Sequence, residues 1–455
     1  MALHLMINLN YNNIPMKKIL LLFIALITLS AMAADKSVII DGRIENSKFY
    51  PGTVHEYKVY IPKQYDGSKP ACLYLGLDGI LYNATAVMDT LIANGEMPVT
   101  IGVFVKPGRI ANDSTVVRYN RSNEFDRVDD TFARFIETEL LPTAESQKLA
   151  DGRTIKISKD PNDRAISGAS SSGIASFNAT FLRPDLFSRI YTTCGTFVSM
   201  RGGHEYPALI RKYEPRPIRV FIHDGSNDIW NALFGHWYEQ NQLVASALDF
   251  AGYEYKAVWD DGNHSIKNGS RLFPEAMRYL WKNYPTPVKA GKSQNNMLQA
   301  ILIDGEDWNA FEGKIPKATK KSATSPDGKL FTETEKNSDW LISYTVDAKG
   351  KKSNRQQYYW LHNTLHQYYD IIGMLYATDG NLYVATKMGI QVCDHSGRVR
   401  AILPYPTTSD IAAFAFEGNN LYIKDINGKI FTRKINATAH PAGAPNVTYK
   451  SQGEG

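Results

Sequence analysis

Along residues 36–285, short apolar runs alternate with stretches in which apolar residues recur about every 3.6 positions. Short, nearly continuous apolar runs are typical of buried strands, and they lie at 71–79, 98–105, 164–170, 218–225 and 253–259. A period near 3.6 predicts helices between these runs, over 129–141 and 233–250. We expect Pro142 to end the first helix and Gly252 to follow the second, with a further helix beginning after Pro274. Strands that alternate with helices predict an α/β fold, a mostly parallel sheet covered on both faces.

The pattern changes near residue 285. Residues 286–297 are polar and turn-rich, which predicts a linker. Beyond it, strand-like pieces recur around Asp-Gly and Asn-Gly turns, at 327–334, 379–394 and 418–434. The sequence therefore predicts an α/β domain over 34–285 and a smaller all-β domain over 298–436. Residues 437–455 are expected to form a loose tail.

The N-terminal 33 residues predict export rather than folded structure. Residues 16–33, "MKKILLLFIALITLSAMA", combine two lysines, an apolar run and a small-x-small ending, which is the pattern of a signal peptide. The apolar run, 19–29, is too short to span a bilayer. We expect residues 1–15 to precede the true start at Met16. The expected location is the periplasm or the outside of the cell, with no transmembrane segment after cleavage.

Charge and cysteine content narrow the function classes. The 51 basic and 46 acidic residues are interspersed and give a net charge of +5. Such a balance argues against nucleic-acid binding. The three cysteines cannot make a disulfide framework and include no CxxC pair for zinc. Cys72 and Cys194 lie in apolar runs and are expected in the core. No cofactor or metal site is predicted.

The candidate chemistry centres on residues 165–177, "AISGASSSGIASF". A predicted strand leads into this serine cluster and a predicted helix follows it. A strand, a Gly-x-Ser-x-Gly turn and a helix form the nucleophile elbow of α/β-hydrolases. Two registers fit. One has Gly168 before the nucleophile Ser170, with Ser172 in the place of the second glycine. The other makes Ser171 the nucleophile. The motif alone leaves both open.

The partners of a nucleophilic serine follow in the required order. A hydrolase of this fold needs an acid and then a histidine, each just after a later strand. "VFIHDGSNDIW" offers Asp224 and Asp228, and "VWDDGNHSI" offers His264. Both acids stay open as the partner of the histidine. We favour Asp228, which lies further into the loop, and expect Asp224 to brace that loop.

Stabilisation of the oxyanion needs backbone N–H groups. The start of the helix after the serines supplies one group of donors. The second donor is expected from the loop after an early strand, in "LYLGLDGILYN", near Gly79 and Ile80.

Residues 36–285 resemble the putative esterase family of α/β-hydrolases, which includes enterochelin esterases and carbohydrate esterase family 1. The resemblance rests on "LGLDG", "ISGASSSGIASFNATFLRPDLFSRI", "FIHDGSNDIWN" and "DDGNHSIKNG". Similar members carry Gly-x-Ser-Ser-Gly-Gly, in which the first serine attacks. The resemblance therefore implies Ser170 as nucleophile, with Asp228 as acid and His264 as base. It also makes the Ser171 N–H an oxyanion donor, and the sequence departs from the pattern at Ser172.

The C-terminal part, 298–436, resembles the β-propellers of gluconolactonases and senescence-marker proteins, chiefly through "DGNLYVATKMGIQVCDHSGRVRAILPYP". A propeller of six blades with ~40 residues each needs about 240 residues, and only about 140 are present. The family's metal-binding turn reads here as 371–374, "IIGM", and isoleucine cannot ligate a metal. We therefore expect a degenerate, non-catalytic segment. His362 and His366 have a possible helical metal spacing but no accompanying carboxylate.

These observations favour an exported serine esterase. By its resemblance, the substrate would be an acylated carbohydrate, from which acetyl or feruloyl groups on plant polysaccharide are removed, or a small ester. One alternative is a metal-dependent lactonase that works through the C-terminal part. The other is a non-catalytic envelope protein that binds carbohydrate and has an inactive hydrolase domain.

Overall fold

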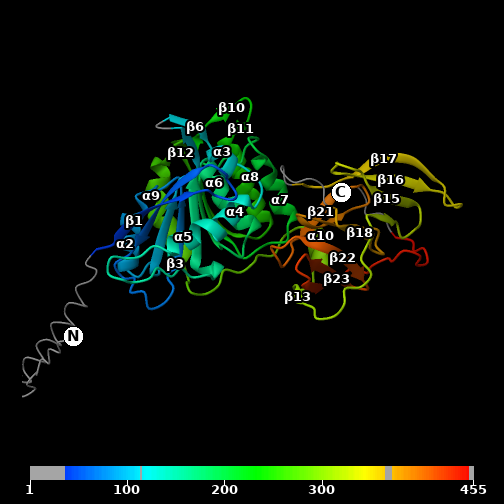
Figure 1. Ribbon diagram of the computed structural model, residues 1–455. Coiled ribbons are helices and arrows are strands. Elements are labelled where there is room, and N and C mark those ends of the chain that lie inside the picture. Colours follow the sequence, from blue (N-terminus) through cyan, green and yellow to red (C-terminus); the bar gives the residue numbers. More distant parts are fainter. Residues whose placement is uncertain (1–35, 113–114, 364–370, 450–455) are drawn as a thin grey trace, which may run out of the picture.

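The computed structural model describes residues 36–112, 115–363 and 371–449 (Figure 1). The expected signal peptide at 16–33, the residues before it, and His366 lie outside the described residues. Among the described residues, no helix is long and apolar enough to cross a membrane.

Ten strands of the first domain form one mixed sheet. They are β1 (Val38–Glu45), β2 (Val54–Ile61), β3 (Cys72–Leu77), β4 (Thr100–Val105), β5 (Arg109–Asn112), β6 (Thr115–Tyr119), β7 (Arg164–Ala169), β8 (Arg189–Thr193), β9 (Arg219–Asn227) and β12 (Glu254–Asn263). Their order is β12-β9-β8-β7-β3-β4-β2-β5-β6, with β1 on β2. The strands from β12 to β4 are parallel, so their carboxyl ends meet at one edge. Each of the five predicted strands is confirmed.

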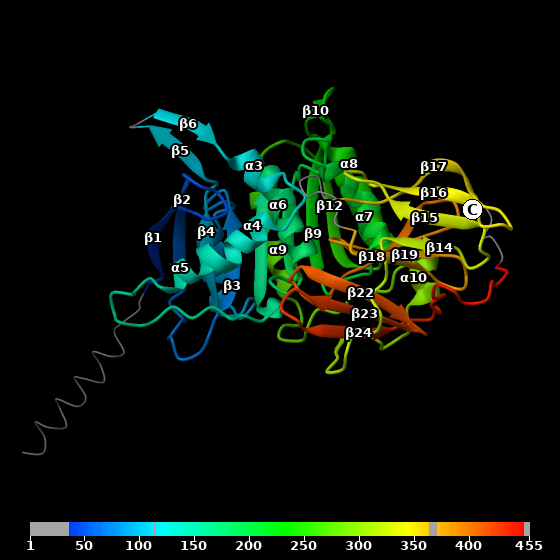
Figure 2. The ribbon, with the colours of Figure 1, turned by 45° about the vertical axis from the view of Figure 1, so that its right-hand side comes forward.

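Helices cover both faces of this sheet, as predicted (Figure 2). One face is covered by α2 (Ala84–Ala93) and α9 (Ile266–Trp281). The other face is covered by α6 (Ser171–Leu182) and α8 (Trp237–Phe250), flanked by α3 (Arg121–Phe125), α4 (Thr131–Phe135), α5 (Leu141–Glu145) and α7 (Tyr206–Lys212). The apolar stripe predicted for α8 is buried, which confirms that helix and its face.

Two helix boundaries differ from their predictions, both at prolines. Pro142 does not stop the helix. A π-helical turn, Ile136–Leu140, leads into α5, where Pro142 occupies the first turn and needs no N–H partner. Helix α9 begins at Ile266 and not after Pro274, which lies inside it. Proline removes only one helical hydrogen bond, and the buried stripe of α9 holds the helix together across that gap.

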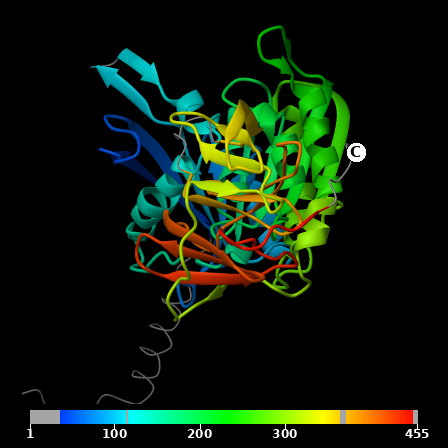
Figure 3. The same cartoon turned by 90° about the vertical axis from the view of Figure 1, so that its right-hand side faces the viewer.

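The C-terminal domain consists of three four-stranded antiparallel sheets among the described residues (Figure 3). The first has β14 (Ser322–Thr324), β15 (Leu330–Thr334), β16 (Trp340–Val346) and β17 (Lys352–Trp360). The second has β18 (Gly373–Tyr376), β19 (Leu382–Thr386), β20 (Gly389–Cys393) and β21 (Val399–Leu403). The third has β13 (Asn309–Ala310), β22 (Ile411–Glu417), β23 (Asn420–Asp425) and β24 (Ile430–Lys434).

Edge strands of the three sheets lie side by side, because β18 packs against both β14 and β22. An α/β domain followed by antiparallel sheets confirms the predicted fold class. The kinship with gluconolactonase propellers stays a prediction. The expected turn at 371–374 is instead the start of β18, where Ile371 and Met374 are buried.

The connection between the domains is packed, in contrast to the predicted linker. Helix α10 (Asn296–Ile301) begins inside it, and Val288 and Met297 are buried. The Asn295 amide donates hydrogen bonds to the Arg211 carbonyl in the first domain and to the Arg400 carbonyl in the second, at 2.9 and 2.8 Å. Polar residues here bind the backbone of both domains.

The predicted loose tail is also packed over residues 437–449. The Ala439 N–H donates to the Gly418 carbonyl, and the Val447 N–H donates to the Pro326 carbonyl. These bonds tie the end of the described chain to two different sheets. The expectation of a loose tail is therefore wrong for this stretch.

Candidate active site

A sharp turn between β7 and α6 presents Ser170 at the carboxyl edge of the sheet. Ser170 has φ 60° and ψ −124°, a strained conformation for a residue with a side chain. The turn is held on both sides, because the Ser170 N–H donates to the Thr193 carbonyl and the Thr196 N–H donates to the Ser170 carbonyl. A Cβ at Gly168 would lie 2.2 Å from the Ser172 carbonyl oxygen. The turn can therefore close only with glycine at 168.

Ser172 explains the departure from the family pattern. Its Oγ accepts a hydrogen bond from the Ala169 N–H at 2.8 Å and donates one to the Ala169 carbonyl at 2.7 Å. The side chain is fully buried. Ser172 thus adds two hydrogen bonds across the turn where glycine would contribute none.

Three side chains from separate loops form one hydrogen-bonded chain. His264 Nε2 lies 2.8 Å from Ser170 Oγ, and His264 Nδ1 lies 2.5 Å from Asp228 Oδ1. Asp228 follows the core of β9, and His264 lies between β12 and α9. The Asp228 carboxylate accepts from Nδ1–H, which leaves Nε2 to accept the serine proton. Of the two serines left open by the motif, Ser170 is the one that faces the histidine.

The two acids of the β9 loop have different environments. Asp224 Oδ1 accepts from the Gly225 N–H at 2.8 Å, and Oδ2 accepts from the Asn241 amide at 2.9 Å. Burial and the neighbouring Asp228 raise the pKa of Asp224. Burial alone would also raise the pKa of Asp228, but hydrogen bonds from His264, Asp224 and the Ile229 N–H outweigh it and lower that pKa. The negative charge therefore resides on Asp228, facing the imidazole, while Asp224 braces the loop.

The expected oxyanion donors are only partly available. Ser171 begins α6, so its N–H lies at the helix N-terminus beside Ser170. The Gly79 N–H donates to the Val105 carbonyl at 3.0 Å and is not a free donor. Among the described residues, the Ile80 N–H has no hydrogen-bond partner. Of the two donors expected from this loop, Ile80 is therefore the one whose N–H stays available, and its role as a donor remains a prediction.

An ion pair that sequence reasoning missed fixes this loop against the elbow. Arg121 binds Asp78 in a bidentate arrangement, at 2.9 and 2.7 Å. The same guanidinium donates to the Ala169 carbonyl at 3.3 Å. Arg121 thus joins the loop after β3 to the residue that precedes the serine.

Two further residues at the site carry no motif of their own. Thr196 Oγ1 lies 3.3 Å from Ser170 Oγ and accepts from the Trp237 indole N–H at 3.3 Å. The Trp237 ring packs edge-on against His264, with centroids 5.9 Å apart. In the sequence, Trp237 is one position of the apolar stripe of a predicted helix. Its contact with His264 could not be predicted, because it depends on α8 starting beside that histidine.

All three cysteines are free and buried, which confirms that Cys72 and Cys194 are core residues. The Cys194 thiol and single ligand atoms of Asp228 and His264 fall within 4.8 Å of one another. Burial and the nearby acids raise the pKa of the Cys194 thiol. Asp228 and His264 are hydrogen-bonded to each other, and His264 to Ser170. We therefore interpret Cys194 as a core residue packed beside these side chains.

His362 contacts a cation. Its Nε2 lies 2.8 Å from Lys212 Nζ across the junction between the domains. Burial and Lys212 lower the pKa of His362 to about 4. The imidazole is therefore neutral and accepts a hydrogen bond from the ammonium group.

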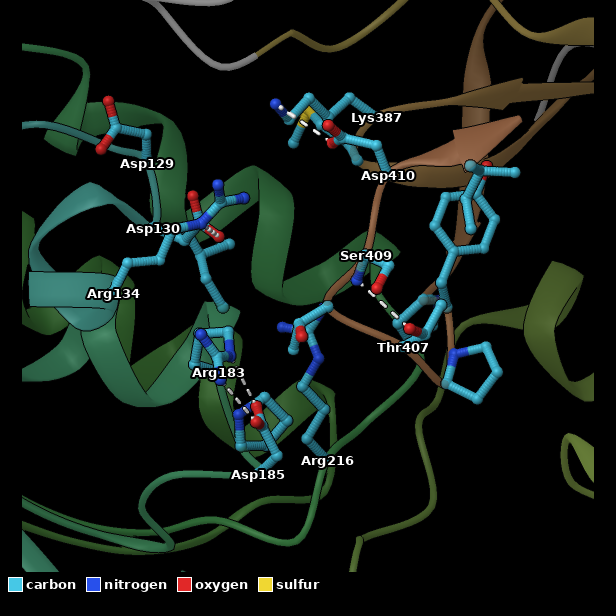
Figure 4. Close-up of a pocket in the computed structure, with 18 of the residues that line it drawn as sticks. Asp129, Asp130, Arg134, Arg183, Asp185, Arg216, Lys387, Thr407, Ser409 and Asp410 are labelled. Carbon is cyan, nitrogen blue, oxygen red and sulfur yellow. Dashed lines mark hydrogen bonds and ion pairs between the residues drawn. The ribbon is translucent and has the colours of Figure 1, made fainter. Parts of the chain in front are cut away.

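A cavity of about 840 Å³ lies between the domains, at the opposite end of α6 from Ser170 (Figure 4). Three ion pairs line it, since Arg183 binds Asp185, Arg134 binds Asp130 and Lys387 lies 3.5 Å from Asp410. Ser170, His264 and Asp228 are not among the residues that line the cavity, so it is separate from their hydrogen bonds.

Several solved structures similar to this chain are described as esterases. A ferulic acid esterase shares 19% identity with a TM-score of 0.42, over 54% of this chain and 98% of its own. An enterochelin esterase from Shigella flexneri shares 16% with a TM-score of 0.42, over 55% of this chain and 59% of its own. A mutant feruloyl esterase module from Clostridium thermocellum, complexed with sinapinate, shares 14% with a TM-score of 0.38, over 55% and 89%.

Curated protein sequences give no match to this chain. The sequence profile of the family described as "Putative esterase" matches residues 51–303, which is more than half of the chain and includes the elbow, both acids and the histidine. The chain belongs to the putative esterase family.

Proposed function

We propose that this protein is a serine carboxylic-ester hydrolase that removes acyl groups, acetyl or feruloyl, from plant polysaccharide. The observation that carries the proposal is the chain of hydrogen bonds from Ser170 through His264 to Asp228. Membership of the esterase family supports an ester substrate. The choice of an acylated carbohydrate rests on the resemblance of the sequence motifs.

The proposed mechanism uses groups of this chain alone. Ser170 Oγ attacks the ester carbonyl carbon while His264 Nε2 takes its proton. The ionised Asp228 stabilises the imidazolium that forms. The N–H groups of Ser171 and Ile80 hold the oxyanion of the tetrahedral intermediate. His264 then protonates the leaving alcohol, and a water molecule repeats the sequence to release the carboxylic acid from the serine.

Substitution of the serine tests this assignment. We expect Ser170→Ala to lower kcat on p-nitrophenyl acetate and methyl ferulate by about 10⁴-fold or more, because no nucleophile is left. Ser171→Ala is the matched control and should keep activity within about tenfold, since its expected contribution is a backbone N–H.

Active-site labelling provides a second readout. A fluorophosphonate should attach to Ser170 within the peptide 165–177. Undiminished turnover by Ser170→Ala would overturn the proposal. Turnover that resists the phosphonate but is abolished by a chelator would favour a metal-dependent lactonase instead.

We also propose that the protein is exported to the periplasm or secreted. The support is the signal-like pattern of residues 16–33. N-terminal sequencing of the protein recovered from its producing cells should begin near Ala34 or Asp35. An intact N-terminus in the mature protein would contradict export by cleavage.

A further inference from the structure

Two tryptophans lie exposed and side by side on the first sheet of the C-terminal domain. Trp340 of β16 and Trp360 of β17 are direct cross-strand partners. Their side chains are 36% and 52% exposed, and the ring centroids lie 6.5 Å apart with the planes tilted by 38°. Two adjoining exposed indoles form an apolar patch, and such patches can mark interaction sites. We call this pair the tryptophan platform.

The platform is held rigidly by its backbone. The Trp360 N–H donates to the Gly397 carbonyl of the neighbouring sheet, and the Trp340 N–H donates to Ser338 Oγ. The His362 ring packs against Trp360, with centroids 5.6 Å apart. The backbone beneath both rings is therefore fixed, and the contacts of Trp360 with His362 and Trp340 limit the side-chain freedom that would be lost when a ligand binds.

The platform adjoins the catalytic domain. The His362 ring, which packs against Trp360, lies across the junction, with its Nε2 2.8 Å from Nζ of Lys212 in α7. The short 3₁₀ turn Gly203–Glu205 directly precedes α7. The chain that leads to this turn begins at Thr196, beside Ser170 Oγ. In Figures 1 and 2, β16 and β17 lie to the right of α7.

We propose that the tryptophan platform binds sugar rings of the polysaccharide whose acyl groups are removed at Ser170. This inference rests on the proposed function. The C–H faces of a pyranose pack well on an indole ring, and two tilted indoles would hold adjacent parts of one glycan chain. The polar flanks Ser338 and Asp339 suit the hydroxyl groups at the ring edges. Two rings are far smaller than the ~800 Å² per partner of a stable protein interface.

Binding is best measured in an inactive background, so that its result does not depend on catalysis. We expect Ser170→Ala protein to be retained by arabinoxylan in affinity electrophoresis. Adding Trp340→Ala and Trp360→Ala together should weaken this retention at least tenfold. Trp360→Tyr keeps an aromatic face and should restore part of it. Val447→Ala, an exposed apolar residue of the same domain that is 37% exposed, is the matched control and should change nothing.

The same substitutions in the active protein separate the two proposals. Turnover of p-nitrophenyl acetate should be unchanged by the platform substitutions, because a small ester does not reach the platform. Equal retention of Ser170→Ala with and without the tryptophans would overturn the glycan proposal, and so would no retention of either protein. Loss of a dimer in sedimentation when the tryptophans are replaced would also overturn it, because the platform would then be a contact between copies.

Discussion

At the residue scale, the two acids after β9 differ in protonation although they are four positions apart. Asp224 is fully buried and its pKa is raised, whereas the pKa of Asp228 is lowered by its hydrogen bonds. Because Asp224 keeps a proton and Asp228 does not, the two acids together carry one negative charge, on the carboxylate that faces His264. The sequence could name both acids but could not rank them by burial, because Asn241, which binds Asp224, comes from α8.

This difference predicts an effect of pH on stability. The folded state binds a proton at Asp224 more tightly than the unfolded chain does, so stability falls as pH rises from ~4 towards the raised pKa of Asp224. Asp224→Asn removes this dependence. Its free energy of unfolding relative to wild type should therefore rise with pH, by up to ~1.4 kcal/mol per pH unit within that window.

Urea unfolding of wild type and of Asp224→Asn at pH 5, 6, 7 and 8 measures how the free energy of unfolding of each protein changes with pH. Asp304→Asn is the matched control, because Asp304 is exposed and forms an ion pair with Lys292, which is also exposed. Parallel curves for wild type and Asp224→Asn would show that Asp224 is ionised in the folded protein, contrary to our interpretation.

At the element scale, the nucleophile elbow is built by neighbours in the sequence. Its strand, glycine, serine and helix are local, so sequence reasoning could identify it. The loop after β3, from which an oxyanion donor is expected, is different, since the Gly79 N–H donates to the carbonyl of Val105, a residue on the adjacent strand. Pairing between strands is not visible in a motif. This is why Gly79 was a wrong expectation although the loop itself is next to the elbow.

Ser172 offers a test of the elbow as an element. Ser172→Ala removes both hydrogen bonds to Ala169 and leaves two buried backbone groups without these partners. We expect a loss of about 1–3 kcal/mol in stability. We also expect a lower kcat with little change in KM, because the turn that holds Ser170 loosens.

Ser176→Ala is the matched control in the same helix. Ser176 is also fully buried, but its Oγ only adds a bond to the Gly173 carbonyl within α6. Its loss should cost less stability and leave kcat unchanged. Equal effects of the two substitutions on kcat would mean that Ser172 does not shape the elbow.

At the scale of the whole molecule, the domains share one apolar core. Tyr213 follows α7 and pairs with Ile402 of β21, and both belong to one buried cluster that runs from the large sheet into the second domain. The sequence indicated two domains from the change in pattern at 285. It could not show that polar residues such as Asn295 bind both domains, because a polar segment has the same composition whether it is packed or free.

The buried ion pair between Glu214 and Arg433 tests this junction. The guanidinium of Arg433 binds both Glu214 oxygens at 2.6 Å, and its side chain is only 4% exposed. Glu214→Ala leaves this cation buried with the Glu306 carbonyl at 3.2 Å as a weak substitute. Breaking one partner of a buried pair is strongly destabilising. We expect a loss of ~3 kcal/mol in the free energy of unfolding.

Calorimetry distinguishes coupling of the domains from a local defect. Wild type should unfold in one cooperative transition, because the shared core makes the domains unfold together. In Glu214→Ala, the C-terminal domain should unfold in a separate transition at a lower temperature. Turnover of small esters at 25 °C should be unchanged, because Ser170 lies at the N-terminal end of α6, away from this junction. Glu335→Ala breaks an exposed ion pair with Arg355 and should leave one transition. A single unshifted transition in Glu214→Ala would mean that the apolar core alone couples the domains.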